Sequence, residues 1–208
     1  ITYLQANNAS TGDIAITNTG TDGGLYTFGS GVVNSGLGDI NLTSLKCVTI
    51  DSPVTASGGN INISSINDFQ INNIISTTGA GKITLTSVNG SDNNGYIELY
   101  NGTPNGAIQS VNGNITLNAD ERIIMESATS ITSTTGNIEL TAGTDITLAL
   151  VSTSGDVNII AANGAISDNN GIANNITAIN LILSASTGIG SSNALETEVS
   201  NLQATNSS

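Results

Sequence analysis

The sequence predicts an all-β chain that folds as a parallel β-helix, or β-solenoid, of about ten turns of roughly 20 residues with three short strands in each turn. Three observations lead to this prediction. A short strand phrase recurs eight times, a second strand follows it at a fixed distance, and the composition favours strands and turns over helices.

The composition suits narrow layers of aliphatic side chains. Hydrophobic residues make up 38% of the 208 residues, which is enough to bury the core of one domain, yet aromatic residues make up only 3% and Trp is absent. We therefore expect the core to consist almost entirely of Ile, Leu, Val and Ala. Because the 24 glycines and the many Asn, Ser and Thr residues disfavour helices, we expect almost no helix.

The first strand of each turn is a phrase of Gly, a variable residue, Ile or Val, a second variable residue, and Ile or Leu. Its alternation places two apolar side chains on one face, and the Gly allows a turn with positive φ before the strand. The eight copies are GDIAI from Gly12, GDINL from Gly38, GNINI from Gly59, GKITL from Gly81, GYIEL from Gly95, GNITL from Gly113, GNIEL from Gly136 and GDVNI from Gly155.

A second strand follows four of these copies in strict register. The step from the first apolar residue of one strand to that of the next is eight residues, from Ile40 to Val48, Ile61 to Phe69, Ile115 to Ile123 and Ile138 to Ile146. Single or paired apolar residues before the next Gly predict a third strand, and they are Val54, Ile74 with Ile75, Ile131 and Val151.

The spacing of the phrase favours a coil over a sandwich. Gly12 and Gly155 are 143 residues apart in seven intervals, so one turn takes about 20 residues. A β-sandwich does not require the same sequence to recur in register on every third strand, whereas a β-solenoid does, because equivalent strands stack directly on one another. With successive turns about 4.8 Å apart, ten turns make a rod about 50 Å long. Asn, Asp and Gly predict loops at 18–24, 87–95, 101–106 and 163–171.

The chain also begins and ends on similar phrases, LQANNAS from Leu4 and LQATNSS from Leu202. Their separation of 198 residues is close to ten turns, so we expect the second copy to arrive in phase with the first. We interpret residues 1–208 as a single solenoid segment, about one period of a longer tandem-repeat protein whose neighbouring repeats stack end to end.

The charge balance excludes several partners. With 16 acidic and three basic residues the formal net charge is -13, and the bases are too scattered to bind nucleic acid. No apolar run approaches the roughly 20 residues of a membrane span, so we expect no membrane insertion.

The single cysteine, Cys47, is expected to be a small buried or half-buried residue.

Several stretches of the chain resemble the repeats of filamentous-haemagglutinin-type exoproteins, the large bacterial surface adhesins. The stretches are GNIELTAGTDITL, LQANNASTGDIAI and the segment from Asn163 to Ser208, and the likeness covers nearly the whole chain. The resemblance implies a right-handed parallel β-helix and an adhesive parent protein. The sequence contains neither that family's secretion domain nor an Arg-Gly-Asp triplet, so adhesion to host-cell or surface glycans and proteins would use parts outside this segment.

Parallel β-helices also include polysaccharide-cleaving enzymes, so the acidic residues of the chain are candidate catalytic residues. Asp120, Glu121 and Glu126 cluster, and a carboxylate pair can cleave a glycosidic bond. Asp120 and Glu121 nevertheless fall at the turn into the second strand, which indicates a solvated corner. Because the chain has no His and a single Arg, we expect no catalytic residue and no enzyme.

Calcium is the only cofactor that the sequence suggests, and only weakly. Asp92 and Asn94 in one Gly-flanked loop, and Asp168 and Asn170 in another, supply the oxygen ligands that calcium prefers. Neither loop matches an EF-hand or a calcium-binding nonapeptide. Asn-rich turns normally satisfy their own backbone, so we expect no metal site.

The function most consistent with these features is that of a structural repeat module. We expect a rigid stalk or extracellular filament within a very large secreted or cell-surface protein, extracellular and of prokaryotic origin. A self-assembling sheath, tube or surface-layer subunit, with lateral self-association through cation-bridged acidic faces, is the alternative. A polysaccharide-active enzyme is the second alternative.

Overall fold

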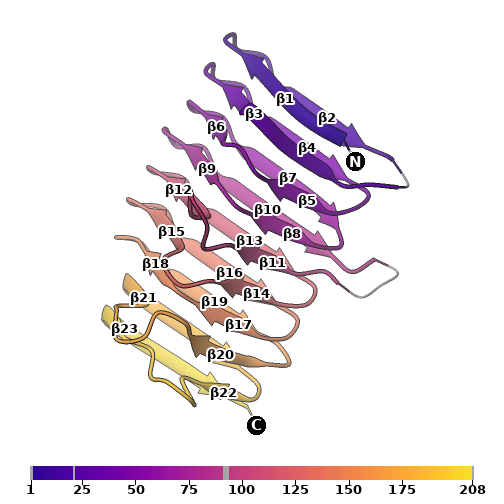
Figure 1. Cartoon of the computed structure of the whole chain (residues 1–208). Coiled ribbons are helices and arrows are strands. Elements are labelled where there is room, and N and C mark those ends of the chain that lie inside the picture. The colour runs from indigo at the N-terminus through magenta and orange to yellow at the C-terminus, as the bar shows by residue number, and fades with distance from the viewer. Residues whose placement is uncertain (1, 21, 91–93, 208) are drawn as a thin grey trace.

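The computed structural model shows a parallel β-solenoid of about nine turns (Figure 1). The structure describes residues 2–20, 22–90 and 94–207, and within these ranges it contains 23 strands and no helix. All pairings between strands are parallel. Among these described residues, then, no helix could cross a membrane.

Three flat faces surround the core, and we name them A, B and C. Face A carries the predicted first strand. It consists of β2 (Ile14–Asn18), β4 (Ile40–Ser44), β7 (Ile61–Ile66), β10 (Ile83–Val88), β13 (Ile115–Ala119), β16 (Ile138–Ala142), β19 (Val157–Ala161) and the second halves of β21 (Ile176–Ala185) and β23 (Thr197–Asn206).

Face B carries the predicted second strand. It consists of the first halves of β1 (Thr2–Asn8) and β3 (Leu25–Asn34), then β5 (Val48–Ile50), β8 (Phe69–Ile71), β11 (Ile97–Leu99), β14 (Ile123–Met125), β17 (Ile146–Leu148), β20 (Ala165–Asp168) and β22 (Gly188–Ile189).

Face C carries the predicted third strand. It consists of the second halves of β1 and β3, then β6 (Val54–Ala56), β9 (Ile74–Thr77), β12 (Ala107–Ser110), β15 (Ser130–Ser133), β18 (Leu150–Ser152) and the first halves of β21 and β23. Each turn runs from B to C to A, so residues 2–206 make nine turns and not the predicted ten.

The core is a set of aliphatic columns that run along the axis. Ile40, Ile61, Ile115 and Ile138 all line face A from inside, in one register that also includes Ile83, and each is at most 1% exposed. The predicted stacking of identical side chains is therefore confirmed. Burying one such side chain stabilises the fold by about 1.5–3 kcal/mol, so the rod derives its stability from many similar contributions.

The glycine before most face A strands is required by close packing and not by a positive φ. A Cβ on Gly136 would lie 2.1 Å from the carbonyl oxygen of Gly113 in the preceding turn, and Gly38, Gly59 and Gly81 meet the same obstacle at 2.0–2.1 Å. Among the described residues, the glycines with φ in the left-handed region lie elsewhere, for example Gly29 and Gly171. The predicted reason for these glycines was wrong, although their position was correct.

A buried column of polar side chains connects these glycines from turn to turn. Ser133 Oγ accepts a hydrogen bond from the Gly136 N–H at 3.0 Å and donates one to the Gly113 carbonyl at 3.0 Å. Ser110 and Thr153 bridge in the same way, and Thr77 donates to the Gly59 carbonyl. Buried backbone groups at this corner thus keep their partners.

The residue after each glycine forms a second ladder, on the outside of the rod. Asp39 Oδ1 accepts the Asn60 N–H at 2.7 Å, and Asn60 Oδ1 in turn accepts the Lys82 N–H at 2.9 Å. The ladder resumes where Asn114 accepts from Asn137, and Asn137 from Asp156. Asn and Asp therefore recur at this variable position because their side chains cap the backbone of the following turn.

Two details of the predicted repeat are wrong. The phrase GYIEL from Gly95 forms β11, which pairs with β8 and β14 on face B, so it is a second strand and not a first. Its spacing of 14 residues from Gly81 reflects this different place. The predicted loop at 163–171 contains β20, because Ala165 and Ile166 continue face B beside Ile146.

The two similar end phrases occupy different places in the turn. Leu4 pairs with Thr27 on face B, whereas Leu202 pairs with Leu181 on face A. The second copy therefore does not arrive in phase with the first within this chain. The tandem array of period 198 stays a prediction, because only the flanking sequence can test it.

Candidate functional site

All five aromatic side chains outside the core lie on or beside face B. They are Tyr3, Tyr26, Phe28, Tyr96 and Tyr100, and the sixth aromatic residue, Phe69, is buried behind the same face. Tyr3 is 66% exposed, and Phe28 and Tyr100 are nearly half exposed. In a chain with so few aromatic residues, this segregation makes face B the candidate binding surface.

The first group of aromatic side chains spans the first two turns. The ring of Tyr3 lies 6.0 Å from that of Tyr26 and 5.9 Å from that of Phe28, the latter edge to face. The Tyr26 hydroxyl lies 3.9 Å from Cys47 Sγ, and this contact raises the pKa of Tyr26. Cys47 is half-buried, as predicted.

The second group lies at the centre of the rod, on three successive strands. We call it the central patch. It has three rows of outward positions: Asp68, Gln70 and Asn72 along β8, Tyr96, Glu98 and Tyr100 along β11, and Arg122, Ile124 and Glu126 along β14.

Charges are concentrated and incompletely balanced in the central patch. The Arg122 guanidinium lies over the Tyr96 ring, 5.1 Å from its centroid. Burial, and then the negative charge of Glu126, raise the pKa of Glu98, although Arg122 acts in the opposite direction. Burial, and then the charges of Asp68 and Glu98, also raise the pKa of Tyr96. A cationic group placed here would relieve this repulsion.

Two loops frame the central patch. One runs between β10 and β11 and leads to Tyr96, and the other runs between β11 and β12, beginning at Tyr100. The Asn89 N–H donates to Asp120 Oδ2 at 3.0 Å, and the Asn101 N–H donates to a Glu126 carboxylate oxygen at 2.7 Å. The described residues at the start of both loops are thus bonded to the following turn.

The predicted acid cluster is not brought together as a catalytic pair. Asp120 lies at the corner before β14 and Glu126 at the corner after it, on the order of 15 Å apart along an extended strand. Carboxylates that cleave glycosides are separated by about 5–9.5 Å. Asp120 is exposed at its corner, as predicted, and both acids accept the loop hydrogen bonds described above.

The predicted calcium ligands have other contacts or lie outside the described residues. Asp92 is not among the described residues, and Asn94 is exposed next to that gap. Asp168 accepts hydrogen bonds from the Asn170 N–H, from Asn175 and from Asn193. Although burial opposes it, these bonds lower the pKa of Asp168. No group of three or more metal-binding His, Cys, Asp or Glu side chains occurs in the described ranges.

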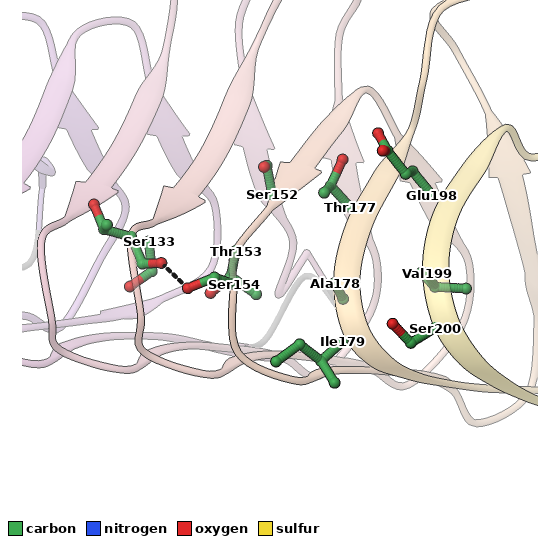
Figure 2. A pocket seen from close by; sticks show the side chains of 11 residues that line it. Ser133, Ser152, Thr153, Ser154, Thr177, Ala178, Ile179, Glu198, Val199 and Ser200 are labelled. Carbon is green, nitrogen blue, oxygen red and sulfur yellow. Dashed lines mark hydrogen bonds between the residues drawn. The ribbon is translucent and has the colours of Figure 1, made fainter.

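A separate hollow of about 520 Å³ lies on face C near the C-terminal end. Its lining is mainly hydroxyl groups, and Figure 2 shows the side chains of Ser152, Thr177 and Glu198 on successive turns. The hollow lies where β21 passes without a break from face C to face A, while the preceding turns bend sharply at this corner. Glu198 is its one charged lining residue, so it presents few groups that could recognise a ligand.

The central patch was not predicted from the sequence. Tyr96, Glu98 and Tyr100 occupy every second position and alternate with Ile97 and Leu99, a strand pattern that could have predicted an outward aromatic row. The misassignment of GYIEL to the first strand concealed that row's place beside Gln70 and Ile124. When the chain is compared with known proteins, no family model, no curated protein and no solved structure matches it.

Proposed function

We propose that this chain is a rigid structural module of a very large secreted or cell-surface protein of a prokaryote, where it serves as a stalk or extracellular filament. The observation that carries the proposal is the unbroken register of face A, in which strands from β2 to β19 pair without a bulge. A continuous parallel stack resists bending because each turn is bonded to the next along its length.

The resemblance to filamentous-haemagglutinin-type repeats agrees with this role, and we propose that relationship on the quoted phrases. The acidic composition supports it further, because a net charge of -13 keeps an extended rod soluble. The apolar side chains at the C-terminal end, where Leu202 is 56% exposed, fit an end-to-end contact with a neighbouring repeat.

The test is a measurement of shape. Nine turns at about 4.8 Å predict a rod about 40 Å long. Because residues 2–206 form whole turns, a direct fusion of two copies should continue from face A to face B and double that length. Small-angle scattering that shows two bodies joined by a hinge, or a length that does not double, would overturn the rod proposal.

The alternative is a self-assembling sheath, tube or surface-layer subunit. The acidic surface favours it if divalent cations bridge neighbouring rods. Electron microscopy with and without millimolar calcium separates the two functions. Isolated rods under both conditions support the stalk, whereas ordered sheets or tubes support assembly.

Polysaccharide cleavage is the least supported function, because Asp120 and Glu126 do not face each other across one site. Turnover of a glycan that is lost in Asp120→Ala or Glu126→Ala would restore this hypothesis. Since both acids also fix loops, the melting temperature of each variant must be measured alongside its activity.

A further inference from the structure

We propose that the outer edge of the last turn is the docking surface for the first turn of a second copy of this chain, in one register that continues face A. The inference rests on the proposed rod and deepens it, because it identifies the partner at the end of the rod and the residues that meet there. The contacts are the same whether the two copies lie on one chain or on two.

The last turn ends in a strand whose outer edge is exposed. Every residue of β23 except Val199 is exposed, and β23 pairs with β21 along its inner edge. Beside it lies an apolar hollow of about 250 Å³, where the aliphatic columns reach the surface; its lining includes Leu183, Ile189, Leu195, Leu202 and Ala204. A strand edge next to apolar side chains offers both backbone hydrogen bonds and burial to a further parallel strand.

The first turn has the complementary surface. The hydrophobic residues that are only partly buried against the core all belong to the first or the last turn, and they are Ala6, Ile16, Ile189, Leu195 and Val199. Ile14 begins the inner face A column that Leu202 ends, so stacking places Ile14 of the next copy against Leu202, and Ile16 against Ala204. The same aliphatic columns then continue through the join.

Gly12 is an independent indication that a turn packs against the first strand of face A. At Gly38, the same position one turn later, a Cβ would lie 2.1 Å from the Gly12 carbonyl oxygen. Around Gly12 itself, the nearest atoms of the described residues are side-chain atoms at 3.7 and 3.9 Å. Because glycine is costly where alanine would fit, a turn lying against Gly12 explains it. In the proposed register that turn is β23, with Ser200 beside Gly12.

The outward polar groups at the join are compatible with this register. Asn201 donates a hydrogen bond to the preceding turn at 2.8 Å, so its Oδ1 can accept the Asp13 N–H of the next copy. Asp13 Oδ1 accepts the Asp39 N–H at 2.8 Å in the same way. On face C, Glu198 ends the outward column that begins at Asn7, so its carboxylate meets an amide and not a second acid.

The two ends differ at the corner from face C to face A. Residues 9–13 form that corner in the first turn, whereas β23 passes straight through it. The hydroxyl-lined hollow of face C leaves this corner open (Figure 2), so the extra residues of the next copy have room to project there. Face A, and not the corner, therefore fixes the register.

The experiment measures self-association of the 208-residue chain by sedimentation velocity and small-angle scattering at rising protein concentration. We expect rods that lengthen in steps of about 40 Å at constant cross-section, because the contact joins unlike ends and does not close. Association should strengthen with salt, since screening reduces the repulsion between acidic chains.

Two variants at the join should weaken the association at least about tenfold each. Gly12→Ala places a Cβ between the turns, and Leu202→Asp places a charge in the aliphatic column. Both should keep the melting temperature of the dilute unmodified chain. Leu37→Asp is the matched control, because Leu37 is 73% exposed but lies at a corner of the second turn, and it should leave the association unchanged.

Cysteine substitutions test the register. Thr17 and Thr205 begin and end one outward column of face A, so across the join their Cα atoms would be about 4.8 Å apart, which a disulfide can span. In a Cys47→Ser background with oxidised glutathione, Thr17→Cys mixed with Thr205→Cys should form a disulfide-linked heterodimer. Thr17→Cys mixed with Gln203→Cys, which lies in the neighbouring column, should form much less.

Four results would each overturn the inference: a chain that stays monomeric at all concentrations, assemblies that thicken, association unchanged in both Gly12→Ala and Leu202→Asp, or equal disulfide yields in the two mixtures. The rod proposal has its own test in the two-copy fusion. A monomeric chain whose fusion still doubles in length would overturn the docking surface alone.

Discussion

The corner that leads from face C into face A differs from the other two corners in almost every respect. It takes four or five residues in each of the first seven turns, whereas the corner from A to B takes two to eight and the corner from B to C takes one to seven. It also holds the stacked glycines and the buried polar column. The central patch lies between the two variable corners.

The difference shows where the rod is constrained and where it is free. At the C-to-A corner the backbones of most successive turns touch, so glycine is needed and the length varies by only one residue. At the other corners a loop can leave the stack and return, provided that a side chain of the next turn fixes it, as Asp120 and Glu126 do. Functional groups can vary there without disturbing the core.

The largest expected effect comes from adding a methyl group at the constrained corner. In Gly136→Ala the new Cβ would lie 2.1 Å from the Gly113 carbonyl oxygen, so the turns must separate. We expect the free energy of unfolding, measured by guanidinium titration, to fall by about 2–3 kcal/mol. The matched control is Gly12→Ala, the same position in the first turn, where no atom lies closer than 3.7 Å.

Gly12→Ala should change the free energy of unfolding by less than about 1 kcal/mol. Equal losses at Gly12 and Gly136 would show that glycine acts through local backbone conformation. The corner would then not be constrained by contact between turns.

The next effect concerns one exception in the buried column, Ala56, which has no hydroxyl to reach the preceding glycine carbonyl. Asn34 compensates: its amide donates to the Gly12 carbonyl at 3.0 Å and to the Gly38 carbonyl at 2.9 Å. Asn34→Ala should leave the buried Gly38 carbonyl unsatisfied, whereas the exposed Gly12 carbonyl still accepts from Asn8, and should lower the free energy of unfolding by about 1–2 kcal/mol.

Ala56→Ser tests this compensation. In the Asn34→Ala background the new hydroxyl should satisfy Gly38 and recover about 1 kcal/mol, whereas in the unmodified chain it should be nearly neutral. A double-mutant cycle from denaturant titrations measures the difference. Additive effects would mean that the two positions do not share an acceptor.

The constrained parts of the rod were predictable from the sequence, and the variable parts were not. Ile40, Ile61 and Ile115 recur in one register because the core admits few alternatives, and that recurrence predicts the fold. Tyr96 and Glu98 belong to a turn with a loop on each side, so the local phrase no longer fixes its own face. Asp120 and Glu126 were recognisable as a cluster, but only the fold shows that each anchors a different loop.

A gain in stability is expected where the outer ladder is interrupted. The Lys82 N–H donates a hydrogen bond to Asn60 Oδ1, but the Lys82 side chain has no oxygen that could accept one from the Asn114 N–H of the next turn. Lys82→Asn should rejoin the ladder and raise the free energy of unfolding by about 0.5–1 kcal/mol. Lys82→Ala is the control and should give no such gain. If both variants gain equally, loss of the lysine, and not the ladder, is the cause.

The smallest global effect is expected at the variable corner after β20, where Asp168 accepts bonds from Asn170, Asn175 and Asn193. Because its pKa is lowered in the folded chain, the ionised carboxylate stabilises the corner above the unfolded pKa of about 3.9. This stabilisation is lost as the pH falls through the lowered folded value. Hydrogen exchange near Asn175 should therefore accelerate below about pH 4, after correction for intrinsic rates, while face A stays protected. In Asp168→Asn the acceleration should disappear, because no charge is left to titrate. If face A loses its protection from hydrogen exchange at the same pH, the corner and the stacked strands open as one unit. The constrained and variable corners would then differ in packing but not in the free energy of local opening.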